Sequence, residues 1–228
     1  MGRCKKNGGA SRQLINHTKM KKFALFLATT IAMVSCGTQS RIPQYSITLS
    51  SVESRADNNV VDAITSVPVD GILQYVYEDG YMRILWFVDR TSFHFSLENK
   101  TDRSIRIDWD NIVYVDYDGE AGRVVHSGIK YNERNSEQAP SIVPRGTRIT
   151  DVLLPADNVE WNMGMTGWEW QEKPLLKGLV WKPVDEVNRN PYMDYTGATM
   201  KIVMPLEIGG SIREYTFTFI AKRHNPNT

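Results

Sequence analysis

The sequence predicts an all-β protein, built as an antiparallel β-sandwich of immunoglobulin-like architecture. From residue 45 onward, short segments alternate apolar and polar residues, as strands with one buried face do. Turn-forming pairs such as Asp79-Gly80 and Gly209-Gly210 separate these segments at close spacing. No segment has the pattern of an amphipathic helix, so the strand–helix alternation of a parallel sheet is absent. A closed β-barrel is the alternative architecture.

The expected strands follow one another along the chain. They are placed at 45–49, 71–77, 81–88, 93–97, 105–107, 112–117, 123–126, 148–154, 200–208 and 212–220. Residues 78–80 are expected to form an Asp-Gly hairpin turn. Residues 52–67 carry several charges and are expected to form a loop, with a short helix as an option at 60–65. Residues 136–146 hold two prolines and a glycine, which is typical of a loop or an edge strand, and Pro155 is expected to end a strand.

Residues 93–109 contain a strand that ends in a Leu-x-Asn pattern at Asn99, then a polar turn, then the alternating pair Ile105 and Ile107. This segment resembles a hairpin that is common in small bacterial sandwich domains. In such a hairpin Asn99 adopts the turn geometry that asparagine tolerates, while both isoleucines return to the core. The resemblance supports the fold class and implies nothing about chemistry.

The N-terminal part of the chain is basic and then apolar. Lys21 and Lys22 precede an apolar run at 23–34, which is too short to span a hydrocarbon core about 30 Å thick and fits the h-region of an export signal. The run ends in Met33-Val34-Ser35-Cys36. This ending resembles the lipobox of bacterial envelope lipoproteins. The resemblance implies cleavage before Cys36, a diacylglycerol on its sulfur and an amino terminus acylated by a fatty acid such as palmitate. An ordinary secretory signal with an incidental cysteine is the alternative.

This resemblance divides the chain into three parts. Residues 1–35 form the signal peptide, with Met20 as the true start in our interpretation and a long n-region as the alternative. Residues 36–43 form a lipidated tether, and residues 44–228 form one β-sandwich domain. Lipoproteins retained in the inner membrane often carry Asp after the lipidated cysteine, whereas this chain has Gly37. The resemblance therefore implies an outer-membrane anchor, and the lack of an acidic run after it implies a domain that faces the periplasm.

Processing changes the charge and the cysteine content. Removing residues 1–35 takes away 7 of the 27 lysines and arginines and none of the 26 acidic residues, which leaves a formal net charge of −6. A mildly acidic domain is a poor nucleic-acid binder, because phosphate contacts need clustered cations. Cys4 is removed and Cys36 is lipidated, which excludes disulfides, thiolate metal sites and a cysteine nucleophile. We expect no cofactor.

The densest group of carboxylates lies around one Asp-Gly turn. Asp116, Asp118 and Glu120 resemble part of a calcium loop, but such loops need further oxygen ligands, including a late bidentate Glu. An Asp-Gly pair at a strand end is also the normal chemistry of a hairpin turn. We interpret these three as solvated turn residues and keep a cation site as the alternative.

The histidines are spread along the chain. His94, His126 and His224 have none of the spacings of known metal or catalytic motifs. His94 alternates with Phe93 and Phe95, so its side chain is expected to point away from the core. The sequence also lacks a nucleophile elbow, a phosphate loop and paired carboxylates in a recognisable context. It therefore favours a protein that is not an enzyme.

Residues 156–195 are rich in aromatic residues and methionines, interrupted by glycines and prolines. The tryptophans of this segment are Trp161, Trp168, Trp170 and Trp181. We expect a long excursion between strands, with short strands at 168–170 and 179–181. The rings could form a satellite core that caps the sandwich, bind a protein partner as hot spots, or stack on sugar rings. Aromatic side chains bury about 150–250 Å² each, so exposing several is costly unless something covers them.

These observations favour a lipid-anchored, non-catalytic lipoprotein of the cell envelope that acts as an interaction or accessory module. Its expected partners are the membrane, through the anchor, and an envelope protein. A lipoprotein that binds glycans or small ligands through the 156–195 segment is the second hypothesis. A divergent envelope hydrolase is the third, and it requires ionisable side chains that converge in a cleft.

Overall fold

The computed structural model describes residues 45–54, 59–61, 64–165, 167–176 and 194–223, and the predicted signal peptide and tether lie outside these ranges. Contacts divide the chain into residues 1–41 and 42–228, and all described residues belong to the second unit. The described residues form fifteen β-strands and three short 3₁₀ helices, with no α-helix. The strands are β1 (Tyr45–Ser54), β2 (Asn59–Val61), β3 (Thr65–Val69), β4 (Ile72–Glu78), β5 (Met82–Val88), β6 (Phe93–Asn99), β7 (Ile105–Ile107), β8 (Val113–Val115), β9 (Ala121–His126), β10 (Ser141–Val143), β11 (Arg148–Pro155), β12 (Val159–Met163), β13 (Trp168–Glu172), β14 (Thr199–Ile208) and β15 (Ser211–Arg223). The 3₁₀ helices are η2 (Trp109–Asn111), η3 (Tyr131–Glu133) and η4 (Ala156–Asn158).

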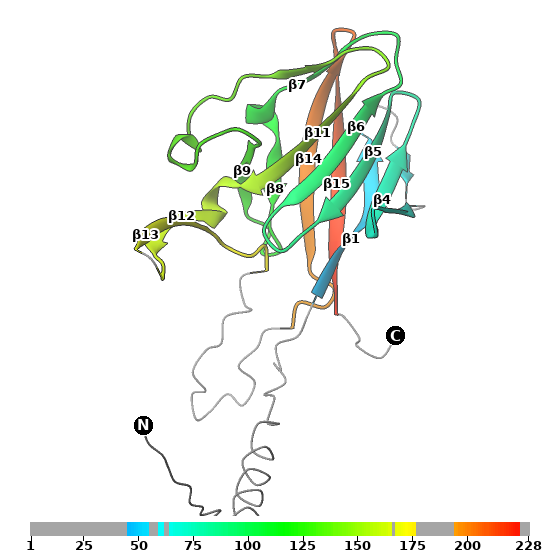
Figure 1. Ribbon diagram of the computed structural model, residues 1–228. Helices are drawn as coiled ribbons and strands as arrows, with labels where there is room; N and C mark the ends of the chain where they lie inside the picture. The colour runs from blue at the N-terminus through cyan, green and yellow to red at the C-terminus, as the bar shows by residue number, and fades with distance from the viewer. Residues whose placement is uncertain (1–44, 55–58, 62–63, 166, 177–193, 224–228) are drawn as a thin grey trace, which may run out of the picture. The chain divides into compact units, whose positions relative to one another are not determined.

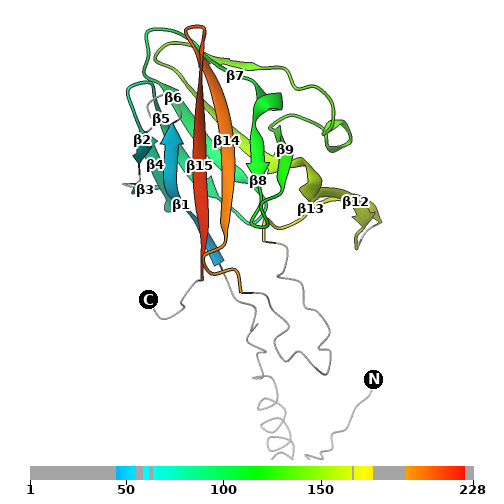
Figure 2. The ribbon, with the colours of Figure 1, turned by 180° about the vertical axis from the view of Figure 1, so that it is seen from behind.

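The strands form a strongly curled antiparallel sheet, which confirms the predicted all-β class. Neighbouring strands follow the order β2-β1-β15-β14-β8-β9-β11-β6-β5-β4-β3, and β7 and β10 join this sheet beside β14. Figures 1 and 2 show the two layers from opposite sides: β1, β15, β14 and β8 form one layer, and β11, β6, β5 and β4 form the other. Among the strands that the structure describes, the path ends at β2 and β3 without closing. The described residues therefore form a sandwich or half-barrel and not the closed barrel that was the alternative.

The hydrophobic core lies between the two layers. The ring centroid of Trp86 on β5 lies 5.0 Å from that of Phe217 and 5.4 Å from that of Phe219, both on β15 of the opposite layer. The ring centroid of Phe95 on β6 lies 5.3 Å from that of the same indole. Trp86, Phe217 and Phe219 expose no surface. Each Å² of apolar surface buried in this way stabilises the fold by about 25 cal/mol.

β1 extends beyond the strand predicted at 45–49, and a β-bulge lies where the predicted strand ended. The register with β15 shifts between Leu49 and Ser51. Such a bulge inserts one extra residue, so the core-facing positions after it no longer continue the earlier alternation. Val52 and Ser54 are buried as a result. The sequence pattern alone could not place them, because the bulge depends on pairing with a strand from the end of the chain.

The prediction of a loop at 52–67 is wrong for most of the described residues in this range. β1 covers its beginning, β2 spans Asn59–Val61 and β3 spans Thr65–Val69, so the short helix considered at 60–65 is wrong too. β2 and β3 are the two edge strands of the main path. Pro68 lies within β3, where an edge position tolerates its missing N–H donor.

Two hairpin turns require positive φ. Asp70 and Gly71 join β3 to β4 with φ of 50° and 80°, as in the two-residue type I′ turn that matches strand twist. The predicted turn at 209–210 is confirmed and also has positive φ at both glycines. The hairpin turn predicted at 78–80 is also present, and the side chain of Asp79 holds it. Asp79 accepts hydrogen bonds from two backbone amides of the turn at 2.7 and 2.8 Å.

Residues 93–109 cross between the layers and do not form the predicted hairpin. β6 pairs with β5 and β11, whereas β7 pairs with β10 and β14. Asn99, which is 1% exposed, holds this crossing. Its side-chain amide donates to the carbonyls of Arg103 at 2.7 Å and Val143 at 2.9 Å, and its Oδ1 accepts from the amide of Thr101 at 2.9 Å. Both isoleucines of β7 are buried in the core, as predicted.

The remaining predicted strands lie close to their expected positions. β10 falls within 136–146 and pairs with β7 away from the main path, as expected of an edge strand. β11 ends at Pro155, as predicted. The strand expected at 179–181 lies outside the described residues. Within the ranges that the structure describes, no helix is both long enough and apolar enough to cross a membrane.

Candidate functional site

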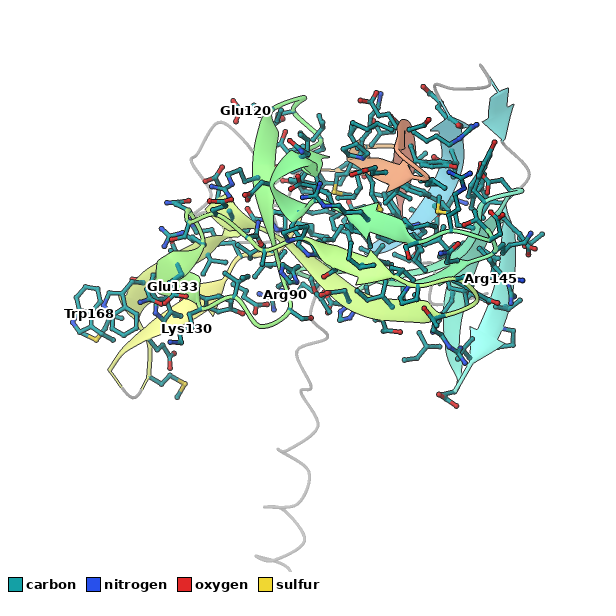
Figure 3. The ribbon with its side chains drawn as sticks, turned by 90° about the horizontal axis from the view of Figure 1, so that it is seen from above. Arg90, Glu120, Lys130, Glu133, Arg145 and Trp168 are labelled. Atoms are coloured by element: carbon teal, nitrogen blue, oxygen red, sulfur yellow. The ribbon has the colours of Figure 1, made fainter. Side chains whose placement is uncertain are left out.

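β12 and β13 form a two-stranded hairpin that is separate from the main sheet. Its register places Trp161 opposite Trp170, and Met163 opposite Trp168. The strand predicted at 168–170 is thereby confirmed as the first part of β13. Figure 3 shows Trp168 at the outer end of this hairpin, at the edge of the view farthest from the bulk of the sandwich.

The hairpin has one apolar and one polar face, because successive side chains of a strand point to opposite sides. The apolar face carries Val159, Trp161, Met163, Trp168 and Trp170, and ends at Glu172. The polar face carries Glu160, Asn162, Glu169 and Gln171. The ribbon is therefore amphipathic, with its three described tryptophans on one side.

The inner half of the apolar face packs on the outer surface of the sandwich. Val159 lies in a small hydrophobic cluster around Val125, and Trp170 packs against this cluster. The ring centroid of Tyr131 lies 6.1 Å from that of Trp170. The guanidinium carbon of Arg134 lies 5.2 Å from the same ring, within the range of a cation–π contact. This half of the hairpin corresponds to the satellite core that the sequence allowed.

The outer half of the apolar face is exposed, and we call it the aromatic tip. It consists of Trp161, Met163 and Trp168, together with Met165 in the turn between the two strands. Trp161 is 52% exposed, Trp168 and Met163 are each 59% exposed, and Met165 is fully exposed. Leaving such side chains in water is unfavourable, and a cluster of them on a domain surface marks an interaction site. Trp181 lies outside the described residues.

Polar contacts fix the base of the hairpin to the sandwich. The Thr91 hydroxyl donates to the carboxylate of Glu172 at 2.8 Å, and the Tyr131 hydroxyl donates to the same carboxylate. Burial and this hydrogen bond raise the pKa of Tyr131 to about 12, so the phenol keeps its proton at neutral pH. The chain after the hairpin is held by a 2.9 Å hydrogen bond from the Leu175 amide to the Arg90 carbonyl.

A pocket of about 270 Å³ lies beside this base. Its lining residues are Ser92, Val125, His126, Ser127, Gly128, Ile129, Tyr131, Val152, Leu154 and Glu172. The carboxylate of Glu172 already accepts two hydrogen bonds from protein hydroxyls. The pocket lining therefore mixes apolar and polar side chains, and most of the hydrogen-bonding capacity of the Glu172 carboxylate is already used by protein hydroxyls.

Asp89, Ser92 and His94 lie together at the β5–β6 turn. Ser92 Oγ lies 3.2 Å from His94 Nε2, and Asp89 Oδ2 lies 2.9 Å from the same nitrogen. In a catalytic triad the serine and the carboxylate engage different ring nitrogens, because one accepts the proton while the other is held. A single nitrogen cannot do both. This cluster therefore does not have triad geometry.

The Asp89 carboxylate acts as the cap of this turn. Its Oδ1 accepts hydrogen bonds from the amides of Thr91 at 2.8 Å and Ser92 at 2.7 Å. Burial raises the pKa of Asp89, but hydrogen bonds from His94, Thr91 and Ser92 outweigh it and hold the pKa below its ordinary value. The carboxylate is therefore ionised at neutral pH, where it holds the turn beside the hairpin base.

His126 belongs to a second, separate pair. Its Nδ1 lies 3.2 Å from Oδ2 of the buried Asp151, and its ring stacks on Trp109 with centroids 4.1 Å apart. His126 faces the core side of its sheet, whereas His94 faces outward as predicted. The two histidines do not converge, and His224 lies outside the described residues.

Asp116, Asp118 and Glu120 surround the β8–β9 turn. Asp116 Oδ1 accepts hydrogen bonds from the amides of Asp118 at 2.9 Å and Glu120 at 3.0 Å. Asp118 and Glu120 are exposed, and Figure 3 shows Glu120 at the periphery. Among the residues that the structure describes, no group of three or more His, Cys, Asp or Glu side chains is placed to hold a metal ion. The buried carboxylate of Asp116 therefore serves the turn itself.

No known protein family, curated protein or solved structure shows significant similarity to this chain. Sequence reasoning named the tryptophans but missed Tyr131 and Arg134, which support Trp170 from a distant part of the chain. One signal was available: Trp161-x-Met163 and Trp168-x-Trp170 both have the two-residue period of a strand. Together they predict a ribbon with one aromatic face.

Proposed function

We propose that this protein is a lipid-anchored, non-catalytic accessory module of the bacterial cell envelope, and that the aromatic tip is its contact surface. The observation that carries the proposal is the exposure of Trp161 and Trp168 on a hairpin whose base is packed and hydrogen-bonded. A fixed base favours binding, because few degrees of freedom are lost when the rings are covered. Tryptophans in such positions are frequent hot spots of interfaces.

The sequence around Cys36 supports the anchor. A small residue precedes this cysteine, and a basic and then apolar segment precedes both. Each CH₂ group buried in the bilayer contributes about 0.8 kcal/mol, so two or three acyl chains hold a protein durably. The net charge of −6 after processing gives no general attraction to anionic lipid. Membrane attachment is thus assigned to the acyl chains. Gly37 favours the outer membrane, and the lack of an acidic run after Cys36 favours a domain that faces the periplasm.

The hairpin geometry favours an apolar contact over a glycan site. Binding sites for polar ligands place a few convergent polar groups beside their apolar lining. Here Glu160 and Asn162 lie on the opposite face from the exposed rings. Glu172, on the same face, already accepts hydrogen bonds from Tyr131 and Thr91. Among the described residues, the hairpin itself therefore offers the exposed rings no free polar side chain on their own face to bind sugar hydroxyls.

Mass spectrometry of the full-length protein purified from bacterial membranes tests the anchor. We expect a mature N-terminus at Cys36 that carries a thioether-linked diacylglycerol and an N-acyl chain. The Cys36→Ala variant is the matched control and should carry no lipid. An intact leader or an unmodified thiol at Cys36 in the wild-type protein would contradict the proposal.

Photo-crosslinking in intact cells tests the contact surface. A photoreactive residue at position 168 should crosslink to an envelope component. The same residue at position 212, which is 74% exposed on β15, should not give that product. Identical crosslinking patterns from both positions would show that the tip has no specific contact.

A further inference from the structure

We infer that the aromatic tip inserts into the interfacial region of the bilayer that carries the lipid anchor, so that the domain is attached at two points. This inference rests on the proposed function and names the partner of the tip as a lipid surface. It assigns a separate task to each attachment. The acyl chains hold the protein on the membrane, and the tip fixes the orientation of the sandwich above it.

The side chains of the tip have the chemistry of a membrane interface. Trp161 and Trp168 each combine a large apolar ring with one N–H donor, and tryptophan is enriched where bilayers meet water. Met163 and Met165 add flexible apolar chains, which adapt to an irregular partner. Glu169 lies on the opposite face of the ribbon. It can therefore remain in water while the apolar face is covered.

The hairpin lies at the end of the sandwich where the chain enters from the anchor. Tyr45, the first residue of β1, pairs with Arg223, the last residue of β15. Figures 1 and 2 show these strand ends at the bottom of the sandwich, and the hairpin projects from the same lower part. The hydrogen bond from Leu175 to Arg90 ties the chain after the hairpin to the β5–β6 turn at this end.

The length of the tether keeps this end close to the membrane. Cys36 precedes Tyr45 by nine residues, which span at most about 30 Å when fully extended. The 13 residues of β15 run along the sandwich for about 40 Å. The end of the sandwich at Tyr45 therefore stays within the length of the tether, about 30 Å, of the lipid surface. The opposite end can lie farther away. The tip consequently meets the bilayer at a high effective concentration.

A lipid surface suits this tip better than a protein groove does. Stable protein interfaces bury about 1,200–2,000 Å² and surround an apolar centre with a polar rim. The tip is four side chains on a narrow ribbon whose polar groups lie on its other face. A bilayer accepts such a ribbon without complementary shape. Because the contact is made by rings and thioethers, it should depend little on ionic strength.

The test uses the purified, lipidated full-length protein in phosphatidylcholine vesicles. Once Cys36 is lipidated no free thiol remains, so Met165→Cys creates one labelling site for an environment-sensitive fluorophore. Ile212→Cys is the matched exposed control. We expect the label at 165 to shift to shorter wavelength and to be quenched by brominated acyl chains, with no change at 212. Raising the salt concentration should leave this difference unchanged.

A second variant separates lipid insertion from mere proximity. Adding Trp161→Ser and Trp168→Ser to the Met165→Cys protein should reduce quenching to the level of the 212 control. Flotation with the vesicles and the melting temperature should stay unchanged. Loss of flotation in the wild-type protein would overturn the anchor itself. Flotation without quenching at 165 would overturn only this inference, and a protein crosslinked at 168 in cells would then identify the tip's partner instead.

Discussion

Two groups of tryptophans in this protein have opposite surroundings. Trp86 lies between the layers, exposes no surface and contacts Phe217 and Phe219 of the opposite layer. Trp161 and Trp168 lie on the β12–β13 hairpin and are 52% and 59% exposed. A buried ring contributes its whole surface to the free energy of folding, whereas an exposed ring contributes little and stays available for contact. Trp86 therefore stabilises the fold, whereas Trp161 and Trp168 are exposed on its surface and free to contact a partner.

Trp170 is the intermediate case and shows how the two regions are joined. It lies on the same face of the hairpin as Trp161, with ring centroids 5.4 Å apart. It also packs against the cluster around Val125 and contacts Tyr131 and Arg134, all outside the hairpin. One half-buried ring thus connects an exposed cluster to a rigid body.

The largest loss of folding stability is expected from Trp86→Ala, which removes the buried ring. Truncating a buried Trp leaves a cavity and typically costs about 3–5 kcal/mol. Urea denaturation followed by circular dichroism measures the loss. Trp86→Phe is the matched control, because it keeps a ring and removes an indole N–H that has no hydrogen-bond partner among the described residues. If Trp86→Ala cost no more than Trp86→Phe, the assigned core packing would be wrong.

The next largest loss of stability is expected from Trp170→Ala, and it should be confined to the β12–β13 hairpin. Removing this ring takes away the contacts with Tyr131 and Arg134, each aromatic contact being worth about 1 kcal/mol. Amide hydrogen exchange should show faster exchange in β12 and β13, with β14 and β15 unchanged, because separate parts of a protein can open separately. Equal acceleration in all four strands would show that the hairpin is part of the main cooperative unit.

The strands of the sandwich could be predicted where one face is buried and the other is solvated. β6 is an example, since Phe93 and Phe95 are buried while His94 between them faces outward. β1 beyond Leu49 could not be predicted in this way, because the bulge opposite β15 changes which residues face the core. The crossing at Asn99 could not be predicted either. A Leu-x-Asn pattern is equally compatible with a hairpin and with a change of layer.

The candidate site shows the same division between local and distant information. The alternation in Trp161-x-Met163 and Trp168-x-Trp170 is local, and it suffices to predict an amphipathic ribbon. Which rings are covered depends on Val125 and Tyr131, which come from β9 and the following loop. No local pattern reports such contacts. The sequence therefore singled out this segment but could not separate its packed half from its exposed half.

A smaller, pH-dependent effect is expected from Asp89→Asn at the turn that supports the hairpin base through Thr91. Hydrogen bonds hold the pKa of Asp89 below its ordinary value despite burial. A carboxyl whose pKa is lowered in the folded state stabilises the fold above the pKa of the unfolded chain, and this contribution is lost as pH falls through the folded pKa. The side chain is 38% exposed, so solvent screening limits the effect to under about 1 kcal/mol.

Urea midpoints measured between pH 7 and pH 3 test this prediction. The wild-type protein should exceed Asp89→Asn in stability at pH 7, and the difference should shrink below about pH 4, where the unfolded carboxyl takes up its proton. Glu120→Gln, at an exposed carboxyl of the β8–β9 turn, is the control. A difference that stayed constant down to pH 3 would show that Asp89 acts only through its shape.

The smallest effect on stability is expected from Trp168→Ala, and it is the sharpest test of the comparison. Trp168 is 59% exposed, and exposed substitutions away from caps and cores usually change stability by less than about 0.5 kcal/mol. The urea midpoint should match that of the wild type, while quenching of the label at 165 by brominated lipid should weaken. Trp86→Ala should have the opposite effects: a large loss of stability, and no direct effect on quenching of the label at 165. If Trp168→Ala destabilised the protein as much as Trp170→Ala does, the ring would have to be covered in the free protein. The aromatic tip would then be part of the fold and not a surface that the fold presents.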